Sequence, residues 1–245
     1  MFYTILPQWP KIKPRFKRIA RFAPLIGILI GFLQSFCWLL LSHFNWPNIS
    51  AALISIAISI FITGGLHLDG LMDTADGIGA GPSKRIEAMK DSRVGAIGVQ
   101  SLVIILMLQL AAIIKLGFYA PLAFPLAAFW GRLSQVFAIG NYEYIFKKES
   151  ISIHKKHWQG ISKEIRPALI IICIGALSFL FNTNLSVSTS LLLISCIALG
   201  LITSMSIPYF INKFLGGHNG DTYGASLVIT ETTNLLILSI ILVQN

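Results

Sequence analysis

Long stretches of apolar residues without a charged side chain divide the chain. A helix needs about 20 apolar residues to cross the hydrocarbon core of a bilayer, and residues 22–42, 44–66 and 94–114 contain no Asp, Glu, Lys or Arg. The longest such stretch, residues 167–212, is long enough for two spans, and residues 222–245 carry only Glu231. The pattern predicts an all-α polytopic membrane bundle.

Seven transmembrane helices account for this pattern. We place them near residues 22–41, from 49 into a polar segment that begins at Thr63, and near 99–114, 121–139, 168–181, 187–208 and 225–243, with a break at 182–184. We see no linker or internal repeat, so residues 1–245 form a single integral membrane domain. Residues 1–21, which are rich in Lys, Arg and Pro, are expected to form a basic interfacial arm.

The positions of the Lys and Arg residues predict the orientation. They gather in residues 1–21, in the loop around Lys84 and in residues 141–166, which are alternate loops. Because cytoplasmic loops carry the excess of Lys and Arg, we expect the N-terminus on the cytoplasmic side of the inner membrane and the C-terminus outside. The polar segment that begins at Thr63 and residues 212–221 then share the cytoplasmic face.

Composition and charge agree with a membrane protein. The chain is 55% hydrophobic and 12% charged, and its net charge is +9. In a soluble protein such a charge would suggest nucleic acid, but basic residues beside spans are explained by anionic lipid headgroups. We therefore expect a lipid bilayer and no nucleic acid as partner, and the sequence leaves the oligomeric state open. The three cysteines lie in apolar spans without metal-binding or redox spacing.

Half of the acidic residues fall in one window, residues 63–98. Of the 10 acidic residues, the window holds Asp69, Asp73, Asp76, Glu87 and Asp91. The first three have spacing i, i+4, i+7, which puts them on one stripe of a helix. Carboxylates this close repel one another in a poorly solvated setting, and a divalent cation removes that cost. Ligands that are all oxygens favour Mg²⁺, Mn²⁺ or Ca²⁺ over zinc.

Further residues of the window extend this hypothesis. After a break at residues 79–83, a short helix capped by Ser83 could return Asp91 to the stripe, as a fourth metal ligand or a catalytic residue. The cations that could bind phosphate oxygens are Lys84, Arg85, Lys90 and Arg93. Membrane orientation alone also explains these cations, and solvated acids at a membrane boundary are the simpler alternative. His67 lies roughly opposite the stripe, which favours packing, hydrogen bonding or substrate contact over metal ligation.

A second polar segment precedes the last span. Its sequence KFLGGHNGD covers residues 213–221, where backbone N–H groups at Gly216 and Gly217 can form an anion-binding nest. His218, Asn219 and Asp221 are then further candidates for substrate contact, although an ordinary glycine-rich turn is the alternative. Glu231 lies inside the last span, where an ionisable group suggests function, unless it only pairs with Arg132 or Lys213.

The two segments together resemble a known family. GGLHLDGLMDTADG, then MKDSRVGAIGV, then GGHNGDTYGA with Glu231 beyond it, are similar in content and order to the cobalamin synthases, the adenosylcobinamide-GDP ribazoletransferases. The resemblance implies a Mg²⁺-dependent transfer that joins adenosylcobinamide-GDP to α-ribazole or its 5′-phosphate. The products would be adenosylcobalamin or its 5′-phosphate, and GMP.

The same resemblance implies roles for the acidic residues. Metal on Asp69, Asp73 and Asp76 would neutralise the pyrophosphate. Asp91 would complete the metal site or accept the proton of the attacking hydroxyl, so that Asp73, Asp76 and Asp91 are the expected catalytic residues.

Two other functions remain as alternatives. The aspartate spacing is loosely similar to that of the CDP-alcohol phosphotransferases of phospholipid synthesis, but the DxxDGxxAR form is absent because Gly77 is followed by Ile-Gly-Ala-Gly. A divalent-cation transporter would also need carboxylates in the membrane. Transporters commonly show paired repeats, which this sequence lacks.

Overall fold

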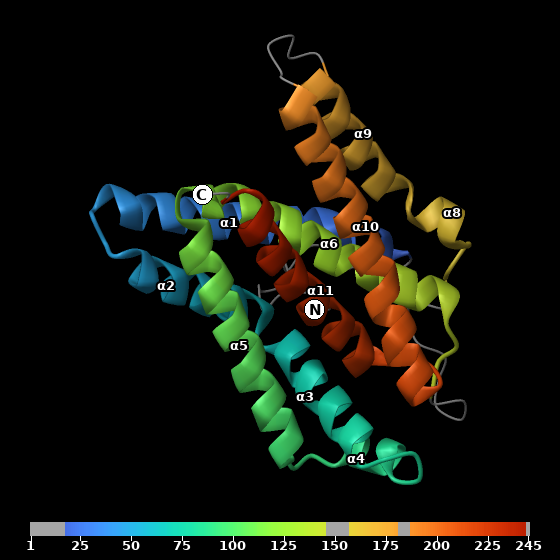
Figure 1. Ribbon diagram of the computed structural model, residues 1–245. Helices are drawn as coiled ribbons and strands as arrows, with labels where there is room; N and C mark the ends of the chain where they lie inside the picture. The colour runs from blue at the N-terminus through green and yellow to red at the C-terminus, as the bar shows by residue number, and fades with distance from the viewer. Residues whose placement is uncertain (1–17, 146–156, 181–186, 244–245) are drawn as a thin grey trace, which may run out of the picture.

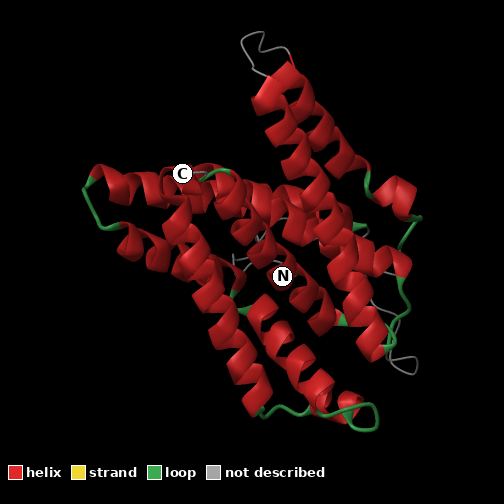
Figure 2. Ribbon diagram, in the orientation of Figure 1, coloured by secondary structure: helices red, strands yellow, loops and turns green. Residues whose placement is uncertain are grey.

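The computed structural model describes residues 18–145, 157–180 and 187–243. Within these ranges the chain consists of helices joined by loops, without a strand (Figure 2). The predicted all-α fold is therefore confirmed. The proposed break at residues 182–184 and nearly all of the basic arm lie outside the described residues.

The predicted spans all fall on helices. In chain order the elements are η1 (Ile19–Phe22), α1 (Ala23–His43), α2 (Asn48–Thr63), α3 (Leu66–Gly79), α4 (Arg85–Lys90), α5 (Ala96–Leu116), η2 (Gly117–Tyr119), α6 (Ala120–Asn141), α8 (Ile161–Glu164), α9 (Arg166–Leu180), α10 (Val187–Leu215) and α11 (Gly220–Ile241). Helix α4 is the expected short helix after the break, but its N-cap residue is Lys84 and no side chain caps it, so the predicted cap at Ser83 is wrong.

The number of membrane spans differs from the expected seven. In the described part of the chain, four helical segments are long and apolar enough to cross a bilayer, and the pair α2 and α3 makes a fifth if it counts as one broken span. A multi-pass membrane protein is confirmed, but a count of seven is not. The continuous second span is corrected: Gly64 and Gly65, with φ of 62° and 69°, separate α2 from α3 at a bend of 89°. Glycine adopts such φ values without steric cost.

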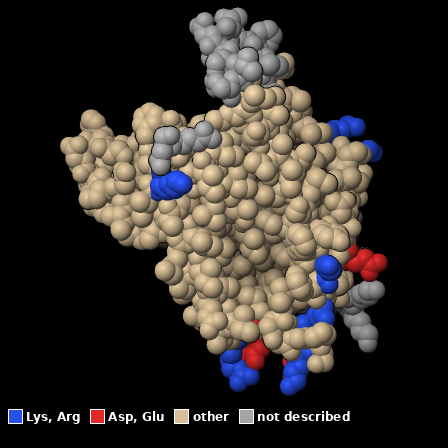
Figure 3. All heavy atoms as spheres, in the orientation of Figure 1, with Lys and Arg blue, Asp and Glu red and all other residues tan. Residues whose placement is uncertain are grey.

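The outer surface is apolar. Large side chains such as Phe36, Met107 and Ile194 are each more than 60% exposed, an arrangement that hydrocarbon tolerates and water does not. The face drawn in Figure 3 is mostly uncharged, and Lys and Arg gather at one end and along the edges. Lipid therefore covers most of the helix bundle.

Close contact between helix backbones holds α1 against α6. Gly27 and Gly31, one turn apart on α1, face the backbone of Ala128 and Pro125, where a Cβ atom would overlap. Small residues at this spacing let helices approach closely in membranes. Pro125 also lacks the N–H that would bond the Pro121 carbonyl, and the Ser35 hydroxyl donates to that carbonyl instead, at 2.6 Å.

The two polar motifs meet because α3 packs against α11. In Figure 1, α3 and α5 lie beside α11, and α4 lies at the far end of α3. Gly70 of α3 touches the backbone of Asp221 at the start of α11, and Gly224 touches the backbone of His67. The sequence predicted only that these two segments lie on the same face, and the structure brings them into contact.

Replacing Gly31 by alanine should destabilise the bundle, because the added Cβ would overlap the backbone of Pro125. We expect a cost of about 1–3 kcal/mol and a lower melting temperature in detergent. Gly175 of α9 is the matched control, since nothing lies within 4 Å of its added Cβ; Gly175→Ala should leave the melting temperature unchanged or raise it. Equal melting temperatures for the two variants would contradict this account of the α1–α6 contact.

Candidate functional site

Three carboxylates from two helices form the centre of the site. Asp73 of α3 interacts electrostatically with Asp221, Asp69 and Asp76, and Asp221 of α11 interacts with Asp69. We call Asp69, Asp73 and Asp221 the acidic cluster. Asp69 is exposed, and Asp73 and Asp221 are partly exposed. The Asn219 amide donates a hydrogen bond to the Asp221 carboxylate at 2.7 Å, which fixes this carboxylate at the start of α11.

Asp76 has a role that the spacing did not predict. Its carboxylate oxygens accept hydrogen bonds from the backbone N–H groups of Gly95 and Gly98, each at 2.8 Å. These groups lie at the N-terminus of α5, where N–H groups have no partner within the helix and the helix dipole favours a negative charge. A Cβ at either glycine would meet the carboxylate. Asp76 therefore joins α5 to α3, whether or not it also binds metal.

Asp91 interacts with Arg93 and not with the acidic cluster. Arg93 donates side-chain hydrogen bonds to its carboxylate, the shortest at 2.7 Å. These bonds hold the pKa of Asp91 at about 2, below the ordinary 3.8, so the group stays ionised at neutral pH. Asp91 is not among the charges that act on Asp73. The structure does not bring Asp91 to the other three aspartates as the sequence suggested.

The donor set suits a hard divalent cation only in part. Among the described residues, no three His, Cys, Asp or Glu side chains converge closely enough to enclose one metal ion. Mg²⁺, however, commonly binds through one or two carboxylates and completes its octahedron with water and substrate phosphates. The acidic cluster offers oxygen ligands of that kind, and the repulsion among them would fall when a cation binds. The residues therefore fit Mg²⁺ that is shared with a phosphate ligand.

The predicted phosphate-binding cations surround α4. Arg85 donates hydrogen bonds to the carbonyl oxygens of Phe214, at the end of α10, and Pro82. Lys84, Lys90 and Arg93 are exposed, and Arg93 pairs with Asp91. Arg85 thus ties α4 to α10. In the view of Figure 1, α4 lies at the end of the molecule where Lys and Arg gather in Figure 3.

The glycine-rich segment is a buried turn at its centre. His218 and Asn219 are 0% and 1% exposed. Nδ1 of His218 lies 3.0 Å from the Thr222 hydroxyl, and Nε2 lies 3.0 Å from the Pro208 carbonyl oxygen. Because a carbonyl oxygen can only accept, Nε2 is protonated and donates a hydrogen bond to it. Asn219 and Thr222 form a reciprocal capping box that starts α11.

Residues 143–145 hold this turn from the other side. The N–H of His218 donates to the Glu143 carbonyl, and the N–H of Ile145 donates to the His218 carbonyl. Gly217 is also buried, against the Glu143 carbonyl, whereas Gly216 is exposed. The segment therefore positions Asp221 and leaves little open surface for an anion nest.

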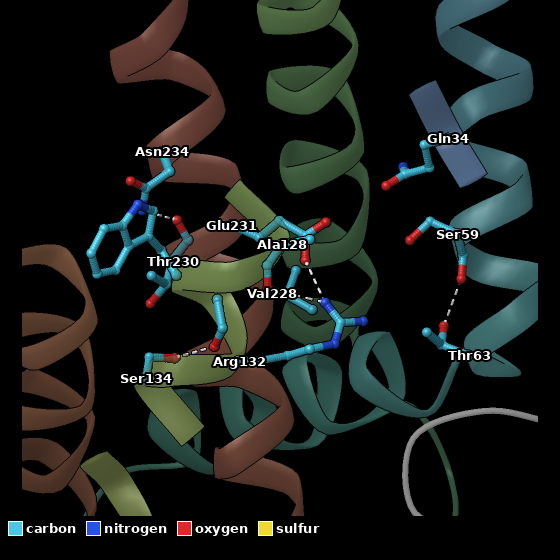
Figure 4. Close-up of polar contacts among 12 residues, drawn as sticks. Gln34, Ser59, Thr63, Ala128, Arg132, Ser134, Val228, Thr230, Glu231 and Asn234 are labelled. Atoms are coloured by element: carbon cyan, nitrogen blue, oxygen red, sulfur yellow. Dashed lines mark hydrogen bonds and ion pairs between the residues drawn. The ribbon is translucent and has the colours of Figure 1, made fainter. Parts of the chain in front are cut away.

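A polar chamber lies behind α3, on the side away from the acidic cluster. Its residues come from α2, α3, α5, α6 and α11, and its volume of about 30 Å³ has room for about two water molecules. Arg132 and Glu231 line it and form an ion pair at 3.5 Å, which confirms one of the two pairings considered for Glu231. In Figure 4, Arg132 extends from α6 toward Thr63 and Ser59 of α2.

His67 faces this chamber. The side chain is 5% exposed, and its Nε2 atom has no hydrogen-bond partner in the protein. His67 is therefore packed, as the sequence favoured, while its contact with substrate stays a prediction. The uncharged chamber residues Ser59, Thr63 and Gln109 were missed by sequence reasoning. They gave no signal, because Ser and Thr in membrane helices commonly bond to their own backbone, as Thr63 does to Ser59 at 2.8 Å.

Neutral variants of Asp73 and Asp76 should have opposite effects on stability. Asp76→Asn replaces a charged cap of α5 and leaves one N–H poorly matched, at a cost of about 1 kcal/mol, so the melting temperature should fall by about 2–4 °C. Asp73→Asn removes a charge that its neighbours repel, so its melting temperature should equal or exceed that of the wild type. Thermal unfolding of both variants in the same detergent measures the difference. A larger fall in melting temperature for Asp73→Asn than for Asp76→Asn would refute the role of Asp76 as the cap of α5.

The buried ion pair predicts a rescue by double substitution. Glu231→Leu removes the carboxylate that pairs with the buried Arg132, and Arg132→Met removes the cation that pairs with the buried Glu231. Each substitution should lower the free energy of unfolding by about 3–5 kcal/mol. The double variant removes both charges and should recover most of the loss. A double-mutant cycle of unfolding free energies measures this coupling. Additive losses would show that the two side chains do not stabilise each other.

Comparison with known proteins places the chain in a family. The family model described as Cobalamin-5-phosphate synthase matches residues 1–239. A relative named adenosylcobinamide-GDP ribazoletransferase from a strain of Prochlorococcus marinus is 49% identical over 99% of this chain and 93% of its own length. Relatives with the same name from Trichormus variabilis and a Synechocystis strain are 37% and 34% identical, over 98% of this chain and 94% and 92% of their own lengths. No solved structure matches significantly. The chain belongs to the cobalamin-5-phosphate synthase family.

Proposed function

We propose that this membrane protein catalyses the last step of cobalamin synthesis, as an adenosylcobinamide-GDP ribazoletransferase. It would join adenosylcobinamide-GDP to α-ribazole or its 5′-phosphate and release GMP. The observation that carries the proposal is the contact of α3 with the start of α11, where Gly70 touches the backbone of Asp221, so that the helix with Asp69 and Asp73 packs against Asp221. The motifs that supply these residues are also the ones that resemble the family.

The acidic cluster would bind the pyrophosphate of the donor substrate through a metal ion. Mg²⁺, or Mn²⁺ in its place, would be held by carboxylates of Asp69, Asp73 and Asp221 and by phosphate oxygens. When bound, it would neutralise the pyrophosphate and the charge that develops on the leaving GMP. The exposed cations Lys84 and Lys90 would attract the same anion from the adjacent end of the molecule.

The reaction needs an in-line displacement at one phosphorus. A ribose hydroxyl of α-ribazole attacks the phosphorus that is attached to cobinamide, and the bond between that phosphorus and the bridging oxygen breaks, so GMP leaves with this oxygen. The hydroxyl proton must pass to a base. Asp91 is our candidate from its place in the sequence motif. Its pairing with Arg93, which lowers its pKa to about 2, makes it a weak base until that pairing is lost. Its bond to Arg93 would have to break before it could reach the cluster.

We further propose that the N-terminus and the acidic cluster face the cytoplasm, in the inner membrane. The exposed cations of α4 support this orientation, because Lys and Arg are concentrated in cytoplasmic loops. A cytoplasmic site would also receive its charged substrates from water. The bulky corrin ring could then stay outside the bilayer.

Purified protein in lipid should release GMP when given both substrates and Mg²⁺, and should stop when the metal is chelated. Asp73→Asn should lower turnover by about 100-fold or more, because it removes a charged group at the phosphates. Glu87→Gln, which neutralises an exposed acid on α4, is the matched control and should stay within about twofold of the wild type, the range expected for a surface change.

Three outcomes would contradict parts of this proposal. Release of CMP from a CDP-alcohol, without GMP release, would favour the phospholipid enzymes. Divalent-ion flux into liposomes without GMP release would favour a transporter. Near-normal turnover of Asp91→Asn, with Asp73→Asn inactive, would show that Asp91 is not the base.

A further inference from the structure

A second and larger cavity lies where the C-terminal parts of α6 and α10 meet. Its volume is about 290 Å³, and it is lined by Phe137, Asn141, Tyr142, Met205, Ser206 and Tyr209. We call it the tyrosine cavity. Ligand sites in proteins usually measure about 300–1,000 Å³, so this cavity is at the small end of that range. It has room for one small ring system.

The lining suits a flat aromatic ring. Three of the six side chains are aromatic and a fourth is the thioether of Met205. Such groups bind ring faces and edges well. Tyr142 and Tyr209 come from different helical segments and border the same space. Ser206 already donates its hydroxyl hydrogen to the Ile202 carbonyl at 2.7 Å. The Asn141 amide is then the main hydrogen-bonding group other than the tyrosine hydroxyls.

The tyrosine cavity is connected to the acidic cluster through the buried turn. The ring of Tyr142 lies 5.2 Å from the ring of His218, and Asp221 follows three residues later. Three residues of extended chain span at most about 11 Å. The Cα atoms of His218, which lies beside the cavity, and Asp221, which belongs to the acidic cluster, are therefore no farther apart than that. A ligand with an aromatic group at one end and a reactive hydroxyl at the other is therefore suited to this end of α11.

We propose that the tyrosine cavity binds the aromatic base of α-ribazole, the nucleoside acceptor; this proposal rests on the proposed function. The other flat ring among the substrates is guanine, whose edge carries several hydrogen-bond donors and acceptors. Burying such groups without partners is costly, and the cavity offers few partners. The benzimidazole-type base of α-ribazole carries fewer polar atoms, so it matches an aromatic and apolar lining better.

Tyr209→Ala tests this assignment, because its side chain is half exposed and its removal should leave the fold intact. Loss of stacking on a base weakens binding by about tenfold, so the KM for α-ribazole should rise by about tenfold. The KM for adenosylcobinamide-GDP and kcat should stay within about twofold, because Tyr209 would touch neither the donor nor the reacting phosphorus. Tyr209→Phe, which keeps the ring, should behave as wild type. Ile194→Ala is the control and should leave both KM values unchanged, since Ile194 is an exposed residue of α10 that does not line the cavity.

Direct binding separates this inference from the proposed function. Equilibrium dialysis of labelled α-ribazole against the full protein in lipid, without the second substrate, should show binding to the wild type and about tenfold weaker binding to Tyr209→Ala. If the wild type binds α-ribazole in this way but releases no GMP, the proposed function fails and the cavity assignment stands. An unchanged affinity and KM for α-ribazole in Tyr209→Ala would overturn the assignment. So would a rise confined to the KM for adenosylcobinamide-GDP, which would place guanine there.

Discussion

Repulsion among Asp69, Asp73 and Asp221 is the constraint on which the rest of this structure depends. Carboxylates that repel one another in partly buried surroundings separate unless their backbones are held. Here the backbones are held by direct contact, because Gly70 removes the side chain that would keep α3 away from Asp221. Under the proposed function, a cation shared with a phosphate would relieve this repulsion.

The groups around the acidic cluster serve to keep α3 and α11 in place. Asp76 fixes the start of α5 on α3, and the capping box of Asn219 and Thr222 fixes the start of α11. Behind α3, the ion pair of Arg132 and Glu231 crosses between α6 and α11 within the membrane bundle. Removing one partner of a buried charge pair is costly, so the pair constrains the positions of α6 and α11.

Parts of this arrangement could be predicted from sequence because they depend on local patterns. Charge-free stretches gave the helices, and the spacing of Asp69, Asp73 and Asp76 gave a stripe on one helix. Arg132 was one of the two partners that the sequence offered for Glu231, and the structure selects it. Other parts depend on contacts between distant segments. A carboxylate stripe looks the same whether it faces a metal or the N-terminus of another helix, so the bonds from Asp76 to α5 could not be read from spacing. A GGHNGD turn can likewise be open to anions or closed, and it is closed here because residues 143–145 bond to His218 from another part of the chain. Asp91 was expected to return to the stripe, yet Arg93, two residues away, pairs with it first.

The central claim is that the acidic cluster of α3 and α11 holds the metal-bound pyrophosphate, with Asp76 retained as the cap of α5. A structure of the protein in lipid with Mn²⁺ and adenosylcobinamide-GDP tests it most directly. We predict metal density between the donor phosphates and carboxylates of Asp69, Asp73 or Asp221, with the N–H groups of Gly95 and Gly98 still bonded to Asp76. Metal and phosphate bound elsewhere, with the acidic cluster unchanged, would contradict the account.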